Sequence, residues 1–253
     1  RSHRRSGALK ITIHGSGDAF GSGGRFNTCL QIEAGDEKLL LDCGSSSMVA
    51  LNKARVARSG LSTLLFTHFH GDHFGGLPAF LLDAQFISRR REPLTIAGPI
   101  GIEHRTRHAL EADFPGASSN RWRFPISFVE IAPEAPAELA GIAVEAFPMV
   151  HDERAGPCQG YRLRQGGKSF AYSGDTAWTD ALIPLAAGAD ALLVECYTYD
   201  RVLANHLDYR SLAAHRDDLD TPRIILTHMG PDMLAHGEAL PETRAHDGMV
   251  LCL

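Results

Sequence analysis

Short apolar blocks recur along the chain, and the way they alternate with polar segments changes between its two halves. In the early part, apolar runs bounded by glycine-rich turns predict strands. Later, apolar strands alternate with segments of helical periodicity. We predict strands over residues 9–13, 28–33, 38–42, 62–67, 94–98, 142–149, 160–164, 168–173, 190–195, 223–227 and 249–253. We predict helices over residues 47–59, 77–87, 100–113, 178–187 and 207–217.

This order of elements favours two sheets in the middle of the molecule with helices outside, an α/β fold with αββα layers. Residues 68–74 are expected to form a loop, and the proline-bearing stretch 115–141 is expected to be loop-rich with one or two strands. The length of 253 residues is close to the upper limit for one hydrophobic core. We therefore expect a single domain over residues 1–253.

Composition excludes several classes of protein. Apolar residues make up 44% and charged residues 22%, which is ordinary for a folded globular chain. No apolar run is long enough to span a membrane, and the basic start of the chain lacks the apolar stretch of a signal peptide, so a cytoplasmic location is expected. The net charge of −5 argues against binding polyanions through the overall field.

The cysteines are odd in number, widely scattered and never in a C-x-x-C pair. This pattern fits neither a disulfide framework nor a cysteine zinc cage. We expect them to be small buried hydrophobic residues: Cys29, Cys43, Cys158, Cys196 and Cys252.

The segment richest in candidate chemistry is HFHGDH at residues 68–73, directly after the apolar strand STLLFT. Three imidazoles and a carboxylate within six residues need polar partners if they are buried. The strand delivers them to one end of a sheet, where α/β proteins place their ligands. Imidazole nitrogen and carboxylate oxygen suit zinc, manganese or iron, and Gly71 allows a sharp turn between them. We interpret the segment as metal-binding.

Three more candidates follow predicted apolar strands. His151 ends PMVH, Asp175 lies in YSGDT, and His228 ends ILTH. Taken singly, either histidine could equally be a structural residue, and Asp175 could be a turn residue or a helix cap.

These segments together resemble the metallo-β-lactamase superfamily. Residues 68–73 are similar to its H-x-H-x-D-H signature, and Asp42-Cys43-Gly44 resembles its structural aspartate. The three later segments resemble its remaining motifs in the same order, so the resemblance extends over nearly the whole chain. It implies the metallo-β-lactamase fold and a hydrolase.

The resemblance also implies two divalent metal ions, zinc first and manganese or iron as alternatives. One ion would be held by three histidines: His68, His70 and His151. The second would be held by Asp72, His73 and His228, with Asp175 bridging the two. A hydroxide between the metals would act as the nucleophile, and Asp72 would orient it.

Two features resemble the ribonuclease Z branch and its small phosphodiesterase relatives. Glu195 ends a predicted strand, and Asn205-His206-Leu207 is expected to open a helix. The resemblance implies that His206 reaches the scissile phosphate and assists the leaving group; the alternative is an exposed histidine at a helix N-terminus. The loop at residues 15–21 resembles the G-T/S-G loop of that branch. We expect a tight turn beside the metal site there rather than a nucleotide-cofactor loop, because Phe20 stands where a G-x-G-x-x-G motif has glycine.

The short separation along the chain between His151 and Asp175 indicates the size of the substrate. Ribonuclease Z carries an RNA-gripping arm between the histidine and the aspartate that correspond to His151 and Asp175, which here are only 24 residues apart. The arginine-rich residues 89–91 and 121–124 could contact phosphates or a base, but a solvated surface is favoured. A small phosphodiester, such as a cyclic nucleotide or sugar phosphate, is therefore expected rather than RNA, and the resemblance implies a homodimer.

Three alternative functions remain open. The first is ribonuclease Z-like processing of RNA 3′ ends. The second is lactone or thioester hydrolysis, although a glyoxalase-II-like enzyme would be expected to add a helical C-terminal domain, and only 25 residues follow His228. The third is a non-enzymatic metal-binding accessory protein, against which the complete set of ligands argues.

Overall fold

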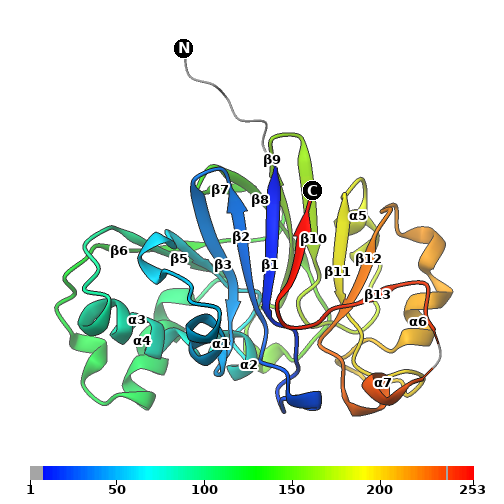
Figure 1. The fold of residues 1–253 in the computed structure, drawn as a ribbon, viewed down its shortest axis with the longest axis horizontal. Helices are drawn as coiled ribbons and strands as arrows, with labels where there is room; N and C mark the ends of the chain where they lie inside the picture. The colour runs from blue at the N-terminus through cyan, green and yellow to red at the C-terminus, as the bar shows by residue number, and fades with distance from the viewer. Residues whose placement is uncertain (1–7, 238) are drawn as a thin grey trace.

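Two seven-stranded sheets pack face to face, with helices on the outer side of each (Figure 1). The structure is a computed structural model that describes residues 8–237 and 239–253. The prediction of an αββα sandwich is confirmed. No helix in the described ranges has the length and apolar character needed to cross a membrane.

The first sheet has the strand order β14-β1-β2-β3-β4-β5-β6. Its pairings are antiparallel from β14 to β3 and parallel from β3 to β6. The strands are β1 (Leu9–Gly15), β2 (Cys29–Ala34), β3 (Glu37–Cys43), β4 (Thr63–Leu65), β5 (Leu94–Gly98), β6 (Ile126–Glu130) and β14 (Met249–Cys252).

The second sheet repeats this plan in the order β13-β12-β11-β10-β9-β8-β7. It is antiparallel from β7 to β10 and parallel from β10 to β13. The strands are β7 (Ala137–Leu139), β8 (Ile142–Pro148), β9 (Gln159–Gln165), β10 (Lys168–Tyr172), β11 (Ala191–Glu195), β12 (Ile224–Thr227) and β13 (Thr243–Arg244).

The helices are short apart from one. They are α1 (Ser47–Lys53), α2 (Gly71–Phe74), α3 (Leu77–Leu82), α4 (Ile102–Asp113), α5 (Leu182–Ala186), α6 (Tyr209–Ala214) and α7 (Pro231–Ala235). Three buried clusters explain the layers. The central one lies between the sheets and includes Ile11 of β1 and Phe170 of β10. The other two lie under the outer helices, with Leu81 of α3 in one and Leu212 of α6 in the other.

Several predicted boundaries are wrong. The helix expected over 47–59 ends at Lys53, and Arg55 has a left-handed backbone with φ 56°. The loop expected over 68–74 contains the helical turn α2. The helix expected to open at residues 205–207 begins at Tyr209, because the Asp208 side chain accepts a hydrogen bond from the Ser211 amide and caps it. In addition, α5 is shorter than the helix predicted over 178–187, and α7 and β13 were not predicted.

Two expectations about individual side chains also need correction. Arg90 is only 3% exposed, and its guanidinium donates hydrogen bonds to the backbone carbonyls of Glu92 and Pro93. It is therefore neither solvated surface nor available to a phosphate. Cys252 is exposed, whereas the other four cysteines are buried as expected, and all five are free thiols.

The two sheets are joined by a buried hydrogen bond close to the HFHGDH segment. Tyr161 of β9 has no exposed surface, and its hydroxyl lies 2.8 Å from the carbonyl oxygen of Phe66, just beyond β4. The same hydroxyl lies 2.8 Å from the side-chain oxygen of Gln159. This hydrogen bond therefore fixes the position of the backbone at Phe66, from which the chain continues to His68.

Replacing Tyr161 with phenylalanine leaves the Phe66 carbonyl buried without this donor. The free energy of unfolding should fall by about 1–3 kcal/mol, the cost of an unsatisfied buried polar group. Urea denaturation measures the change, with Tyr199→Phe at a half-buried tyrosine as the matched control. Equal unfolding midpoints for Tyr161→Phe and the wild type would show that this bond contributes nothing.

Candidate metal centre

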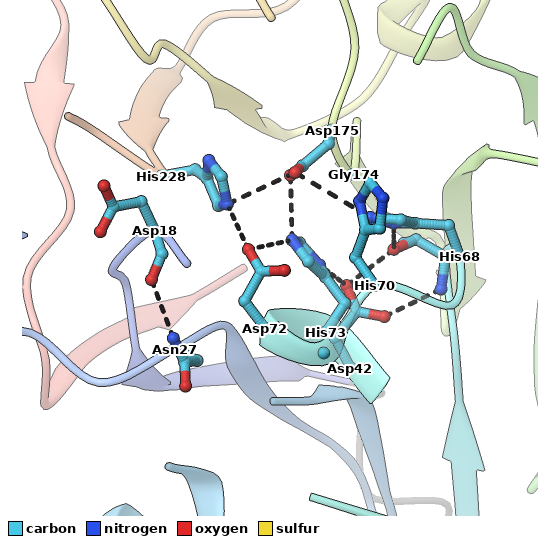
Figure 2. A network of polar contacts seen from close by, with 12 residues as sticks. Asp18, Asn27, Asp42, His68, His70, Asp72, His73, Gly174, Asp175 and His228 are labelled. Carbon is cyan, nitrogen blue, oxygen red and sulfur yellow. Dashed lines mark hydrogen bonds and ion pairs between the residues drawn. The ribbon is translucent and has the colours of Figure 1, made fainter. Parts of the chain in front are cut away.

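Seven side chains from separate strand ends converge at one edge of the two sheets. His68 follows β4, and the signature continues into α2; the other three follow β8, β10 and β12. Figure 2 shows His68, His73 and His228 grouped around the carboxylate of Asp175. The structure brings together every ligand candidate singled out in the sequence: His68, His70, Asp72, His73, His151, Asp175 and His228.

The seven candidate ligands form two groups, and Asp175 of the second group also lies close to the first. His68, His70 and His151 make up one group, in which His151 Nε2 lies 3.0 Å from His70 Nδ1. Each group offers ligand atoms that all lie within 4.8 Å of one another.

The second group consists of Asp72, His73, Asp175 and His228. The Oδ2 atom of Asp72 lies 3.0 Å from His228 Nε2 and 3.5 Å from His73 Nε2. Asp175 reaches both groups, because its Oδ1 is 3.0 Å from His73 Nε2 and its Oδ2 is 3.8 Å from His151 Nε2. Its carboxylate therefore lies where a bridging ligand would stand.

The outward-facing ring nitrogens have partners of their own. His73 Nδ1 lies 2.7 Å from Asp42 Oδ2, and His151 Nδ1 lies 2.7 Å from the carbonyl oxygen of Asn205. Asp42 also accepts hydrogen bonds from the amide and the hydroxyl of Thr67, next to His68. Asp42, which the sequence resemblance marked as a structural aspartate, therefore contacts both ends of the ligand segment. Such bonds orient the rings and leave the inner nitrogens free to bind a metal.

The inner atoms fit a cation. The buried His68 Nε2 makes no hydrogen bond within the described residues. His73 Nδ1 faces the carboxylate of Asp42, and its Nε2 lies 3.0 Å from Asp175. Burial lowers the pKa of His73, but the charges of Asp175, Asp72 and Asp42 outweigh it and hold that pKa well above its usual value. The carboxylates therefore favour a positive charge at this point, which a divalent ion would supply in place of the proton. Imidazole and carboxylate donors suit zinc, manganese and iron.

The protonation states agree with this reading. Burial, reinforced by the neighbouring His73, holds the pKa of His68 well below its usual value, so this imidazole is neutral, the form that binds metals. Burial alone would raise the pKa of Asp175, but the charges of His228 and His73 outweigh it and hold that pKa well below its usual value. Asp175 is therefore an ionised carboxylate.

The backbone is strained at two of these positions. Asp42 has φ 60° and His228 has φ 56°, in the left-handed region that disfavours side chains. Such strain persists only where the surroundings over-determine the conformation, as at functional sites. Space is also limited here, because a Cβ atom on Gly44 would lie 2.1 Å from the Asp72 carbonyl oxygen. A glycine after β3 is therefore required for α2 to approach.

His206 lies beside these groups on the loop after β11. Its Nδ1 donates to Glu195 Oε1 at 2.8 Å, and Glu195 has no exposed surface. Burial lowers the pKa of His206, but the hydrogen bond and charge of Glu195 outweigh it, so that pKa lies above its usual value. The ring is nearly parallel to that of His228, 5.8 Å between centroids. It is thus held in place before α6 begins, not at a helix N-terminus.

A cavity of about 430 Å³ opens onto the cluster, and His206 lines it together with Asp72, Asp175 and His228. The loop at residues 15–21 lies beside it, as predicted, since the Ser16 carbonyl accepts a hydrogen bond from the His228 amide at 3.1 Å. Sequence reasoning gave no role to two further lining residues, Phe20 and Tyr197. In the sequence, only their positions could have marked them: Phe20 lies within the glycine-rich loop, and Tyr197 follows Glu195 by two residues.

The fold and this cluster define a metal-dependent hydrolase of the metallo-β-lactamase fold. A family model described as Anti-Pycsar protein Apyc1 matches residues 9–245, and the chain belongs to that family. It is also 27% identical over 251 residues to a ribonuclease Z of Mycobacterium bovis (strain BCG / Pasteur 1173P2), covering 88% of this chain and 86% of that protein.

Solved structures show the same architecture. The metallo-β-lactamase fold protein YhfI from Bacillus subtilis has a TM-score of 0.76 at 21% identity, covering 97% of this chain and 99% of its own. A diphosphatase from the PhnP family has a TM-score of 0.77 at 18% identity, covering 96% and 97%. At these identities the likeness establishes the fold, and the chemistry has to be argued from the site.

Substituting Asp42 with alanine should weaken metal binding by about 10- to 100-fold, because the outer nitrogen of His73 loses its acceptor and the segment before His68 loses its anchor. Competition between the zinc-loaded protein and a chelator measures the affinity. Asp36→Ala, at an exposed aspartate in the β2–β3 turn, is the matched control. Identical chelator curves for Asp42→Ala and the wild type would rule out the supporting role of Asp42.

Proposed function

We propose that this protein is a dinuclear metal-dependent phosphodiesterase that acts on a small phosphodiester or nucleotide. The observation that carries the proposal is His206, oriented by the buried Glu195 on the wall of a cavity that members of both ligand groups also line. Metal ligands alone suit many hydrolases. A fixed imidazole beside them, with a pKa above its usual value, is the additional group that cleavage of a phosphate ester uses.

The metal assignment follows the two groups. We assign one divalent ion to His68, His70 and His151, and a second to Asp72, His73 and His228, with Asp175 shared between them. When bound, two such ions lower the pKa of a water molecule and neutralise charge on the phosphoryl oxygens. Zinc is the first candidate, because the donors are imidazoles and carboxylates at short separations.

The protein's own groups orient the reaction. Asp72 lines the cavity and is 9% exposed, so its carboxylate accepts a hydrogen bond from the attacking water and aligns it. Glu195 engages Nδ1 of His206, which leaves Nε2 to face the substrate. The protonated imidazole donates to the phosphoryl group or the leaving oxygen. The hydrogen bond and charge of Glu195 favour this protonated form.

A small substrate is favoured over RNA. The residues between His151 and Asp175 are taken up by a short turn at Glu153–Ala155 and the β9–β10 hairpin. An arm that grips transfer RNA has no place in that stretch. The net charge of −5 also gives no general attraction for a polyanion. Because the chain has relatives named ribonuclease Z, precursor transfer RNA is the second candidate substrate.

Turnover by the metal-loaded protein tests the proposal. A cyclic nucleotide and bis(p-nitrophenyl) phosphate should be hydrolysed, and both activities should disappear on treatment with a chelator. A lactone and a precursor transfer RNA serve as competing substrates in the same preparation. Hydrolysis of the lactone alone, or of the RNA alone, would contradict a small-phosphodiester activity.

Catalysis and metal binding can be separated with two variants. His206→Ala should keep its full metal content while kcat for a phosphodiester falls by about 100- to 10,000-fold, the usual range for a general acid or base. Asp175→Ala should lose metal as well as activity, because two cations then repel each other with less anionic charge between them. Metal analysis and kinetics on the same samples measure both effects.

His104→Ala, at an exposed histidine on α4, is the matched control and should behave as the wild type in both measurements. Near-normal turnover by His206→Ala would show that this histidine is structural. That result would remove the main support for phosphodiester cleavage and favour the lactone alternative.

A further inference from the structure

A phenylalanine stands unusually exposed at the cavity. Phe20 is 81% exposed, the highest value among the large hydrophobic side chains in the described ranges. Isolated exposed apolar residues are common on protein surfaces and need no explanation. This one lines the same cavity as Asp72, His206 and His228, so its ring is within reach of whatever binds there.

The loop that carries Phe20 is tightly built. Asp18 has no exposed surface, and one of its carboxylate oxygens accepts from the Phe20 amide at 3.3 Å and the Ser22 amide at 2.8 Å. Its other oxygen accepts from the Ser22 hydroxyl at 2.7 Å. The carbonyl of Asp18 accepts from the side chain of Asn27 at 2.8 Å, beside the metal cluster in Figure 2. Gly21 follows with φ 66°, a left-handed turn that glycine permits.

A second anchor holds the far side of the loop. Asp247 accepts hydrogen bonds from the amide of Ser16 at 2.9 Å and from the amide of Phe26 at 2.9 Å. The loop is therefore tied at its start, middle and end to buried or partly buried carboxylates. An aromatic ring presented on such a support loses little conformational freedom when a ligand packs on it.

The cavity thus combines two kinds of surface. Its charged part consists of carboxylates and imidazoles, which suit a phosphate with bound cations. Its aromatic part consists of Phe20 and Tyr197, and the ring of Tyr197 lies 4.8 Å from that of His206. A volume of about 430 Å³ suits a mononucleotide-sized molecule that uses both parts.

We infer that Phe20 is a base-binding residue that stacks on the nucleobase of a nucleotide phosphodiester whose phosphate lies at the metal cluster. The inference rests on the proposed function and names the residue of the cavity that would bind the base of a nucleotide substrate. Stacking on an aromatic ring accepts every base, because each has a π-face. Phe20 therefore contributes affinity, and the reacting groups stay with Asp72 and His206.

The test compares two substrates on the metal-loaded full chain: a 3′,5′-cyclic nucleotide and the same cyclic sugar phosphate without its base. Phe20→Ala should raise KM for the nucleotide by about 5- to 150-fold, the loss expected for one base–aromatic stack. Its kcat should stay within about twofold, and kinetics with the base-free substrate should be unchanged. Phe20→Trp should retain or improve the affinity for the nucleotide, because a ring is restored.

Phe86→Ala is the matched control, since Phe86 is 54% exposed but does not line this cavity. It should leave both substrates unaffected. Metal content and circular dichroism of Phe20→Ala should match the wild type, which excludes a collapsed loop.

Each contrary outcome is distinct. If the wild type hydrolyses the nucleotide but Phe20→Ala does so with the same KM, the base-binding role is overturned and the proposed function stands. If Phe20→Ala weakens both substrates equally, the residue supports the loop and does not bind a base. If the wild type hydrolyses neither substrate, the proposed function fails and the inference with it.

Discussion

The convergence of imidazoles and carboxylates around Asp175 is the constraint on which the rest of the structure depends. Five imidazoles and two carboxylates from separate strand ends point their donor atoms at one small volume. Buried carboxylates held this close to one another are unfavourable unless positive charge, on the imidazoles or on a metal ion, lies between them. The protein therefore spends polar contacts on holding the rings in place, with Asp42 behind His73 and the Asn205 carbonyl behind His151. The strained backbone of Asp42 and His228 belongs to the same requirement.

The sandwich makes this convergence possible because each sheet contributes strands that end at the same edge. β4 and α2 of one half supply the signature, while β8, β10 and β12 of the other supply His151, Asp175 and His228. Ligands drawn from two sheets stay in register only if the sheets cannot slide. The central apolar cluster and the bond from Tyr161 to the Phe66 carbonyl keep them fixed.

The metal cluster is an arrangement for hydrolysis in general, and the cavity walls narrow the choice of substrate. On one side, the buried Glu195 holds the imidazole of His206 at the cavity. On another side of the cavity, the hydrogen-bonded loop after β1 presents the exposed ring of Phe20. Solved structures at 18–21% identity share this architecture, and a shared architecture does not fix the substrate. Function in this chain is therefore decided by a few residues on loops that the sandwich holds still.

The sequence by itself determined the layers and the strand ends at which the candidate ligand residues lie. Each of these rests on local information, since an apolar strand followed directly by a polar donor specifies both an element and the side chain at its end. Only the tertiary structure decided that His206 pairs with Glu195 ahead of a helix capped by Asp208, that Arg90 is buried, and that Phe20 lines the cavity. These depend on contacts between segments that the local pattern does not relate, because packing between sheets, loops and helices sets which side chains meet.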